Sequence, residues 1–297
     1  MLRVHPELEA QLVATPDDDG AWLVYEDWLI EQGDPRSELI ICERTETADA
    51  GRALATLEPL LFGPEHKAFR AALANPMWRR AGFIEACRFE STRPGAREPL
   101  VAFLSSPAAT LVTRLNLQNA DAAMIGELHR ARALRWLCVG TTRTLDTFDS
   151  ASLDGLDHLD ELRVSSIGKL AAAPALARLR VLYIGGHGDA ELDQLASLGL
   201  ARLERLELSL GIGELHGRGT TRGFPALCHL HVNVLAGGGE RAVAAVIASG
   251  IVAQLRRLTV SGPTARALSD VERRRFRGGV LAHLEEVHLP NGMLVKQ

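Results

Sequence analysis

Leu203-Glu-Arg-Leu206-Glu-Leu208 is the clearest copy of a six-residue pattern, L-x-x-L-x-L, that recurs along most of the chain. Nine copies align on a central apolar residue: Cys87, Leu115, Leu137, Leu162, Leu182, Leu206, Leu230, Leu258 and Val287. Successive central residues are 20 to 29 positions apart. Alternating apolar residues predict a short strand with one buried side, because successive side chains of a strand point to opposite faces. A single strand cannot bury that side alone, so neighbouring copies must stack.

This pattern and its period resemble the leucine-rich repeat. The resemblance implies an α/β solenoid, in which the strands form a parallel sheet on a concave face and the connecting segments return along a convex face. Ala120–Arg132 and Glu240–Val252 carry apolar residues at helical spacing, so we expect helices there. Gly211–Gly223 is rich in glycine and is expected to be irregular.

The repeats depart from the family pattern in one respect. Many leucine-rich repeats place Asn, Cys or Thr five positions after the central leucine, where the side chain hydrogen-bonds the backbone. Here these positions are Ala120, Thr142, Ile167, His187, Gly211, Leu235, Pro263 and Gly292. Because only Thr142 fits, we expect a solenoid of uneven curvature.

Residues 1–80 lack the pattern and are expected to form a small all-helical domain, followed by a repeat domain of about nine repeats over residues 81–297. The expected helices are Glu7–Ala14, Gly20–Gln32, a third through Leu39–Ile41, Arg52–Leu61 and Glu65–Ala74. Asp17–Asp19 can cap the second helix and Gly33 can end it. Trp22 and Trp28 in one helix predict a small packed core.

The stretch Pro16-Asp-Asp-Asp-Gly-Ala-Trp-Leu-Val-Tyr-Glu-Asp-Trp-Leu-Ile-Glu-Gln-Gly-Asp-Pro-Arg-Ser-Glu-Leu-Ile40 resembles the repeat-companion domain that precedes leucine-rich repeats in myxobacterial and planctomycete proteins. It departs at Glu26, Ser37 and Leu39, where the family favours Ala, Gly and Phe. The resemblance implies an accessory role beside the repeats. Trp78–Ile84 also resembles the junction into the first repeat, so helices and first repeat are expected to share one core.

Bulk properties narrow the classes of function. A net charge of −4 and a pI of about 6.2 do not favour binding to nucleic-acid phosphates. No apolar run reaches the length of a membrane span, and the first residues, MLRVHPELEAQL, do not have the pattern of a signal peptide. Cys42, Cys87, Cys138 and Cys228 form no C-x-x-C pair. We therefore expect a reduced, cytoplasmic protein, and richness in Ala, Arg and Leu favours a bacterial source.

Residues that flank the central leucines are expected to line the concave face. The expected partner-binding residues are Arg114, Trp136, Arg163, Tyr183, Arg205, Glu207, His229, His231 and Arg257. Exposed Trp and Tyr beside arginines have the composition of a binding hot spot. The alternative is a solvated face with scattered aromatic residues.

Other chemistries have weaker support in the sequence. His288 is two strands from His229 and His231, roughly 10 Å away, and ligands must converge on a metal ion at about 2 Å. No metal or cofactor is therefore expected. The basic run Arg273–Arg277 is expected to decorate an outer helix. Gly237–Arg241 lacks the lysine and hydroxyl of a phosphate-binding loop, and no nucleophile or zinc-protease signature occurs.

The sequence therefore predicts a non-catalytic scaffold or regulatory subunit that recognises another protein. A subunit of a larger bacterial signalling or defence assembly is one special case of this interpretation. The alternative is a nucleotide- or nucleic-acid-handling or enzymatic accessory protein, which would need polar groups clustered in a cleft. At the end of the chain, Asn291-Gly292 predicts a tight turn, after which Met293–Val295 folds back as a short cap. Because this cap is short, the C-terminal end is expected to be a second contact surface or a self-association edge.

Overall fold

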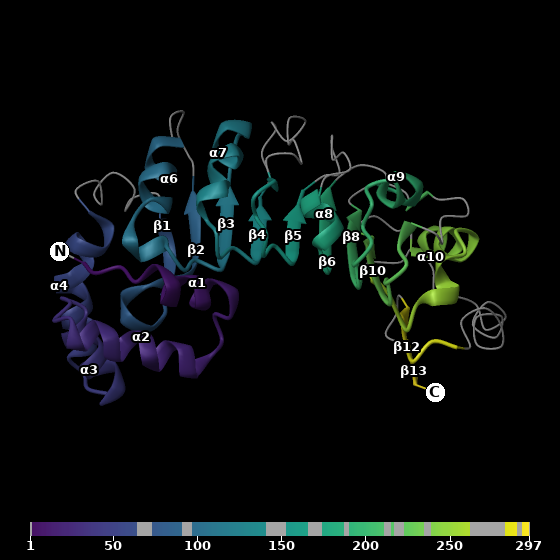
Figure 1. The fold of residues 1–297 in the computed structure, drawn as a ribbon. Helices are drawn as coiled ribbons and strands as arrows, with labels where there is room; N and C mark the ends of the chain where they lie inside the picture. The colour runs from purple at the N-terminus through teal and green to yellow at the C-terminus, as the bar shows by residue number, and fades with distance from the viewer. Residues whose placement is uncertain are drawn as a thin grey trace. The chain divides into compact units, whose positions relative to one another are not determined.

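The computed structural model of the chain describes residues 2–63, 73–90, 97–140, 153–165, 174–186, 190–210, 215–216, 223–234, 239–261, 283–289 and 293–296. Figure 1 labels its helices and strands. The chain divides into two compact units. Unit 1 consists of Met1–Thr142 and Ser152–Leu159, and unit 2 consists of Arg143–Ala151 and Asp160–Gln297. The predicted domain boundary at residue 80 falls inside unit 1, and a separate helical domain there stays a prediction.

Unit 2 contains one parallel strand for each of its six L-x-x-L-x-L copies. The strands are β5 (Glu161–Val164), β6 (Val181–Gly186), β8 (Arg205–Leu210), β10 (His229–Val234), β11 (Arg257–Ser261) and β12 (Glu286–Leu289). Neighbours in this order pair in parallel, with the central residues opposite one another. All six central side chains are at most 3% exposed. The predicted strands are confirmed, and one parallel strand per copy is the arrangement of a leucine-rich repeat.

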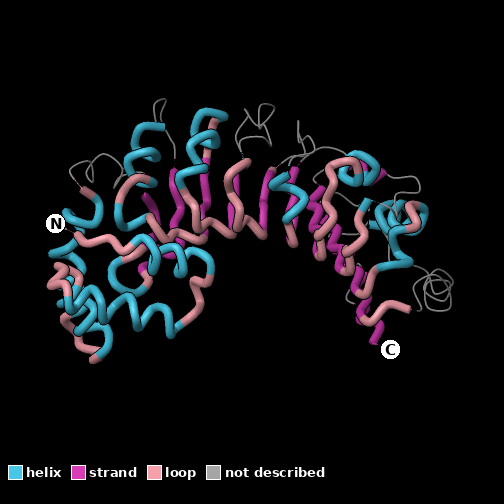
Figure 2. The backbone as a smooth tube through the Cα atoms, in the orientation of Figure 1, coloured by secondary structure: helices cyan, strands magenta, loops and turns pink. Residues whose placement is uncertain are grey.

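Short helices connect these strands, as the cyan segments of Figure 2 show. They are α8 (Pro174–Arg178), α9 (Leu192–Ala196) and α10 (Gly239–Ala248). The helix predicted over Glu240–Val252 is shorter than expected, because Gly250 adopts a left-handed φ of 72° and a 3-10 turn over Ile251–Gln254 comes next. A residue in this conformation ends an α-helix.

Parts of two predicted segments lie outside the described residues. Of Gly211–Gly223, the structure describes Gly223 and Leu215–His216, which is strand β9 and pairs in parallel with β7 (Ala190–Glu191). The basic run Arg273–Arg277 falls wholly outside the described residues.

The last described strand, β13 (Met293–Lys296), folds back antiparallel on β12, with Val295 opposite Val287. This pairing confirms that Met293–Val295 folds back on β12, while the predicted turn at Asn291-Gly292 lies outside the described residues. Because β12 now has a partner on both sides, its backbone amides should exchange slowly with deuterium. Deleting residues 290–297 should speed exchange in Glu286–Leu289 by about tenfold or more and leave β8 unchanged. Equal protection of Glu286–Leu289 from exchange without residues 290–297 would show that β13 is not the cap. That the C-terminal end is a second contact surface or a self-association edge stays a prediction.

Unit 1 has three parallel strands and one antiparallel strand at the edge. Strands β2 (Ile84–Glu90), β3 (Arg114–Gln118) and β4 (Trp136–Val139) pair in parallel, as predicted. Strand β1 (Leu73–Trp78) pairs antiparallel with β2. The prediction that residues 1–80 are all helical was therefore wrong for β1, which includes the last two residues of the expected helix Glu65–Ala74; residues 64–72 lie outside the described residues. Pairing across an otherwise open sheet edge overrides local helix propensity here.

The connecting segments of unit 1 are also broken into short pieces. They are α6 (Arg97–Leu104), a 3-10 turn over Pro107–Ala109, α7 (Ala122–Gly126) and a 3-10 turn over Glu127–Arg130. The helix expected over Ala120–Arg132 is thus a short α-helix that tightens after one turn. Asp121 caps α7 by accepting a hydrogen bond from the Met124 N–H at 2.8 Å.

Four helices occupy the N-terminal segment: α1 (Pro6–Ala14), α2 (Asp19–Glu31), α3 (Ser37–Arg44) and α4 (Ala50–Phe62). The Asp18 carboxylate accepts from the N–H groups of Gly20 and Ala21 at 2.9 and 3.1 Å, which is the predicted cap of α2. After α2, Gly33 adopts a left-handed φ of 61°, as expected for a helix stop.

These helices share one core with the first repeat. The side chains of Trp22, Tyr25 and Leu29 pack with Phe83 and Leu111 in a single buried cluster. Trp22 meets Phe83 edge-on, with ring centroids 5.9 Å apart. The predicted shared core is confirmed by these contacts.

The companion-like motif, which is the stretch Pro16–Ile40 that resembles the repeat-companion domain, also forms ion pairs with the junction that leads into the first repeat. Arg79 pairs with Asp17 at 2.8 Å, and Arg80 pairs with Asp19 at 3.0 Å. The buried Glu26 pairs with Arg80 as well, at 2.6 Å. These contacts hold the backbone between β1 and β2 against α2, so the acidic residues of the motif act in docking the junction.

Candidate protein-binding surfaces

The predicted partner-binding residues of unit 2 gather on the side of its sheet that faces away from the buried leucines. We define the unit 2 face by the alternate residues of β5 to β12: Glu161, Arg163, Val181, Tyr183, Arg205, Glu207, Ser209, His229, His231, Asn233, Arg257, Thr259, Ser261, Glu286 and His288. The parallel register aligns them in rows across the strands. Seven of the nine predicted residues lie on this face, and the other two, Arg114 and Trp136, lie in unit 1.

The charges of the unit 2 face are arranged in pairs. Three arginines each contact a glutamate: Arg163 with Glu161 at 2.8 Å, Arg205 with Glu207 at 2.5 Å, and Arg257 with Glu286 at 3.3 Å. The positive charges of these three arginines and the negative charges of the three glutamates sum to zero. The described face therefore lacks the positive excess that binding to a phosphate backbone requires.

Tyr183 gives this face an aromatic contact point. The Arg163 guanidinium carbon lies 5.5 Å from the centre of the Tyr183 ring, within the range of a cation–π interaction. The ring lies close to Gly185, where an added Cβ would come within 2.9 Å of the Tyr183 Cε1 atom. Gly185 thus leaves room for the orientation in which Tyr183 stacks with Arg163.

The two predicted histidines of this face are half-buried. Burial, followed by the positive charges of Arg205 and Arg257, lowers the pKa of His229. Burial also lowers the pKa of His231, although Glu207 acts in the opposite direction. Both imidazoles are therefore neutral at pH 7, and they add polarity without charge. Among the described residues, no group of three or more His, Cys, Asp or Glu is placed to hold a metal ion.

A row of small polar side chains that sequence reasoning missed continues the unit 2 face. Ser261 donates from Oγ to Asn233 Oδ1 at 3.2 Å, and Asn233 donates from Nδ2 to Ser209 Oγ at 3.4 Å. The hydroxyl of Ser261 also lies 3.0 Å from His231 Nε2. The signal was present in the sequence, because Ser209, Asn233 and Ser261 each lie three positions after a central leucine.

Unit 1 presents a smaller face of the same kind. The Arg114 guanidinium carbon lies 5.3 Å from the centre of the Trp136 ring, so these two predicted residues meet on neighbouring strands. Arg88 pairs with Glu90 on β2 at 2.9 Å. In the described part of each unit, an arginine therefore stacks on an aromatic ring of the sheet face.

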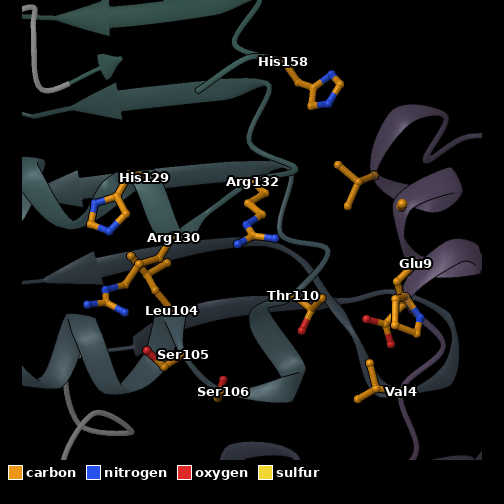
Figure 3. A pocket seen from close by; sticks show the side chains of 13 residues that line it. Val4, Glu9, Leu104, Ser105, Ser106, Thr110, His129, Arg130, Arg132 and His158 are labelled. Atoms are coloured by element: carbon orange, nitrogen blue, oxygen red, sulfur yellow. The ribbon is translucent and has the colours of Figure 1, made fainter. Parts of the chain in front are cut away.

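A groove in unit 1, which the sequence did not predict, encloses about 760 Å³. Helix α1 and the segments that lead into three successive repeats line it, as Figure 3 shows. Its lining residues are Val4, Pro6, Glu9, Ala10, Val13, Leu104, Ser105, Ser106, Thr110, His129, Arg130, Arg132 and His158. No pattern in the sequence links α1 to these segments, because the groove forms only when the N-terminal helices pack beside the repeats.

No model of a known protein family and no curated protein matches the chain. Solved structures with a similar backbone include an internalin C2 from Listeria monocytogenes, with 16% identity, 60% of this chain and 80% of that chain covered, and a TM-score of 0.36. Another is the internalin inlF from the same organism, with 11% identity, coverage of 70% and 74%, and a TM-score of 0.35. The assignment of a leucine-rich-repeat architecture rests on the L-x-x-L-x-L copies of this chain and on the strands that they form. Among the described residues no helix has the length and apolarity to cross a membrane.

Proposed function

We propose that the protein is a non-catalytic scaffold that recognises a protein partner through the unit 2 face. The observation that carries this proposal is the stacked Arg163 and Tyr183, set among three self-neutralising arginine–glutamate pairs. Tyrosine and arginine are enriched in binding hot spots. A neutral surface rich in hydrogen-bonding groups suits another protein, whose own surface carries both signs of charge.

The N-terminal helices, on this proposal, form a repeat-companion domain that closes the first repeat. The ion pairs of Arg79 with Asp17, just before α2, and of Arg80 with Asp19 and Glu26 on α2 support this accessory role. We propose further that the protein is bacterial and cytoplasmic and belongs to a larger signalling or defence assembly. Cys42, Cys87, Cys138 and Cys228 form no disulfide among the described residues, which suits a reducing compartment.

The proposal predicts that Trp136→Ala combined with Tyr183→Ala weakens partner binding by about 2–4 kcal/mol, because buried aromatic anchors dominate interface energetics. The partner would be recovered on the full chain by affinity purification from the native host and identified by mass spectrometry. Its dissociation constant would then be measured by calorimetry for the parent, each single variant and the double variant.

Both side chains are on open sheet faces, so the variants should keep the parent's melting temperature to within a few degrees. A matched control is Leu23→Ala, which also truncates an exposed apolar side chain but lies on α2. The single variants separate the contributions of the two units. Unchanged affinity in folded Tyr183→Ala would remove the unit 2 face from the interface and contradict the proposal, whatever the effect of Trp136→Ala.

A further inference from the structure

The groove of unit 1 has two walls, and both are held in place by hydrogen bonds. Arg36 donates from Nη2 to the Arg3 carbonyl at 2.5 Å, just before α1, and Arg135 donates from Nη2 to the Ala14 carbonyl at 2.6 Å, at the end of α1. On the opposite wall, Ser106 donates to the Phe103 carbonyl at 2.6 Å. A site whose walls are fixed before binding loses little conformational entropy when a ligand enters.

The groove lies across consecutive repeats. Its repeat-side wall includes residues before β3, before β4 and at His158, and in Figure 3 these lie across the groove from Glu9 and Val4. A volume of about 760 Å³ lies within the range of about 300 to 1,000 Å³ found for small-molecule pockets, so the volume alone does not choose between a compact and an extended ligand. The arrangement of this wall across consecutive repeats favours an extended ligand that crosses the ends of several repeats.

The polar lining of the groove is more positive than the rest of the chain. It contains two arginines against one carboxylate, that of Glu9, while the whole chain has a net charge of −4. Glu9 already accepts a hydrogen bond from the Tyr25 hydroxyl at 2.7 Å, and Arg130 is partly engaged by Glu127 at 2.9 Å. Arg132 is exposed, and its guanidinium makes no hydrogen bond or ion pair with any residue that the structure describes. Arg132 is thus the cation in the groove that is available to an acidic group.

The groove also has an apolar part, beside the polar side chains of Ser105, Ser106, Thr110, His129 and His158. Val4 is 63% exposed, and Pro6, Val13 and Leu104 continue the apolar surface beside it. A small inorganic anion would pair with Arg132 but leave these side chains in water. A peptide can pair with Arg132 and also cover the apolar side chains, because its own side chains point alternately to opposite sides of an extended backbone.

We propose that this groove binds an extended peptide segment of a partner, with an acidic side chain at Arg132 and apolar side chains against Val4 and Val13. The groove is separate from the unit 2 face and does not depend on the function proposed for that face. The ligand class is an acidic peptide with interleaved apolar residues.

The test is selection of a random peptide phage library on the full-length protein, followed by fluorescence polarisation with the recovered peptides. Ala10→Trp fills the groove from α1, and Ala55→Trp is its matched control on the exposed side of α4. Arg132→Ala removes the cation, and Arg52→Ala is its control. We expect acidic peptides whose affinity falls about tenfold or more with Ala10→Trp and with Arg132→Ala, as for loss of a charge-assisted hydrogen bond, while the control variants bind like the parent.

The Trp136→Ala, Tyr183→Ala protein should bind these peptides as the parent does, which separates this test from that of the unit 2 face. The proposal is overturned if no recovered peptide distinguishes the parent from Ala10→Trp. It is also overturned if Arg132→Ala leaves affinity unchanged, or if inorganic phosphate binds in an Arg132-dependent way and no peptide does. Thermal melts of every variant establish that a loss of binding is not a loss of folding.

Discussion

Leu206→Asp should abolish the cooperative unfolding transition of unit 2. Leu206 is fully buried in β8, where its register partners are Leu182 on β6 and Leu230 on β10. Burying an unpaired carboxylate among these leucines costs several kcal/mol. Because a folded domain is stable by only about 5–15 kcal/mol, this one change removes most of the margin. The loss should spread along the stack, since each repeat is stabilised chiefly by its neighbours.

A matched variant separates burial from charge. Ser209→Asp places the same carboxylate in the same strand but on the unit 2 face, where Ser209 already accepts a hydrogen bond from Asn233 at 3.4 Å. It should melt within a few degrees of the parent. Thermal melts followed by circular dichroism would compare the two variants. A transition like that of the parent for Leu206→Asp would mean that the leucines of the L-x-x-L-x-L pattern do not face the core.

The strands could be predicted because the L-x-x-L-x-L pattern determines how its apolar side chains can be buried. Apolar residues at alternate positions, repeated at a short period, have no other way to be buried than by stacking in parallel. The same alternation predicts that Tyr183 and Arg163 lie on the opposite face of the sheet. Features that local periodicity determines, such as strand positions and the direction of alternate side chains, could therefore be read from the chain alone.

The groove and the edge strand depend on contacts between distant segments. Strand β1 forms where helix propensity predicted the end of a helix, because pairing with β2 covers an open sheet edge. The groove needs α1 to lie beside residues that are about a hundred positions away in the chain. No spacing in the sequence reports such a contact, and an alternation of side chains along one strand cannot reveal it.

The pair formed by Asp34 and Arg36 was also missed, since arginine is rarely buried. In the structure the side chains of Asp34 and Arg36 are 0% and 2% exposed and pair at 2.8 Å. Arg36 also lies 5.4 Å from the centre of the Phe83 ring, the first aromatic residue of the repeats. This short segment of the companion-like motif therefore joins the helices to the repeats.

The pH dependence of this pair has a definite sign. Burial alone would raise the pKa of the Asp34 carboxyl, but hydrogen bonds from Arg36 and from the Arg3 N–H more than offset it and lower that pKa below its usual value. A carboxyl whose pKa is lower in the folded than in the unfolded protein stabilises the fold at pH values above its unfolded pKa, about 3.9. This contribution is complete at neutral pH and is lost as the pH falls through the folded-state pKa.

Arg36→Ala should destabilise unit 1 by about 3–5 kcal/mol, because it leaves the Asp34 carboxylate buried without its partner. Arg52→Ala is the matched control: Arg52 is 83% exposed and pairs with Asp49 at 3.1 Å, and an exposed pair contributes at most about 1 kcal/mol. Urea unfolding at pH 7 would measure both losses. Asp34→Asn combined with Arg36→Met should recover part of the loss, since no buried charge then remains unpaired. If Arg36→Ala were no more destabilising than Arg52→Ala, the pair would not be what joins the helices to the first repeat.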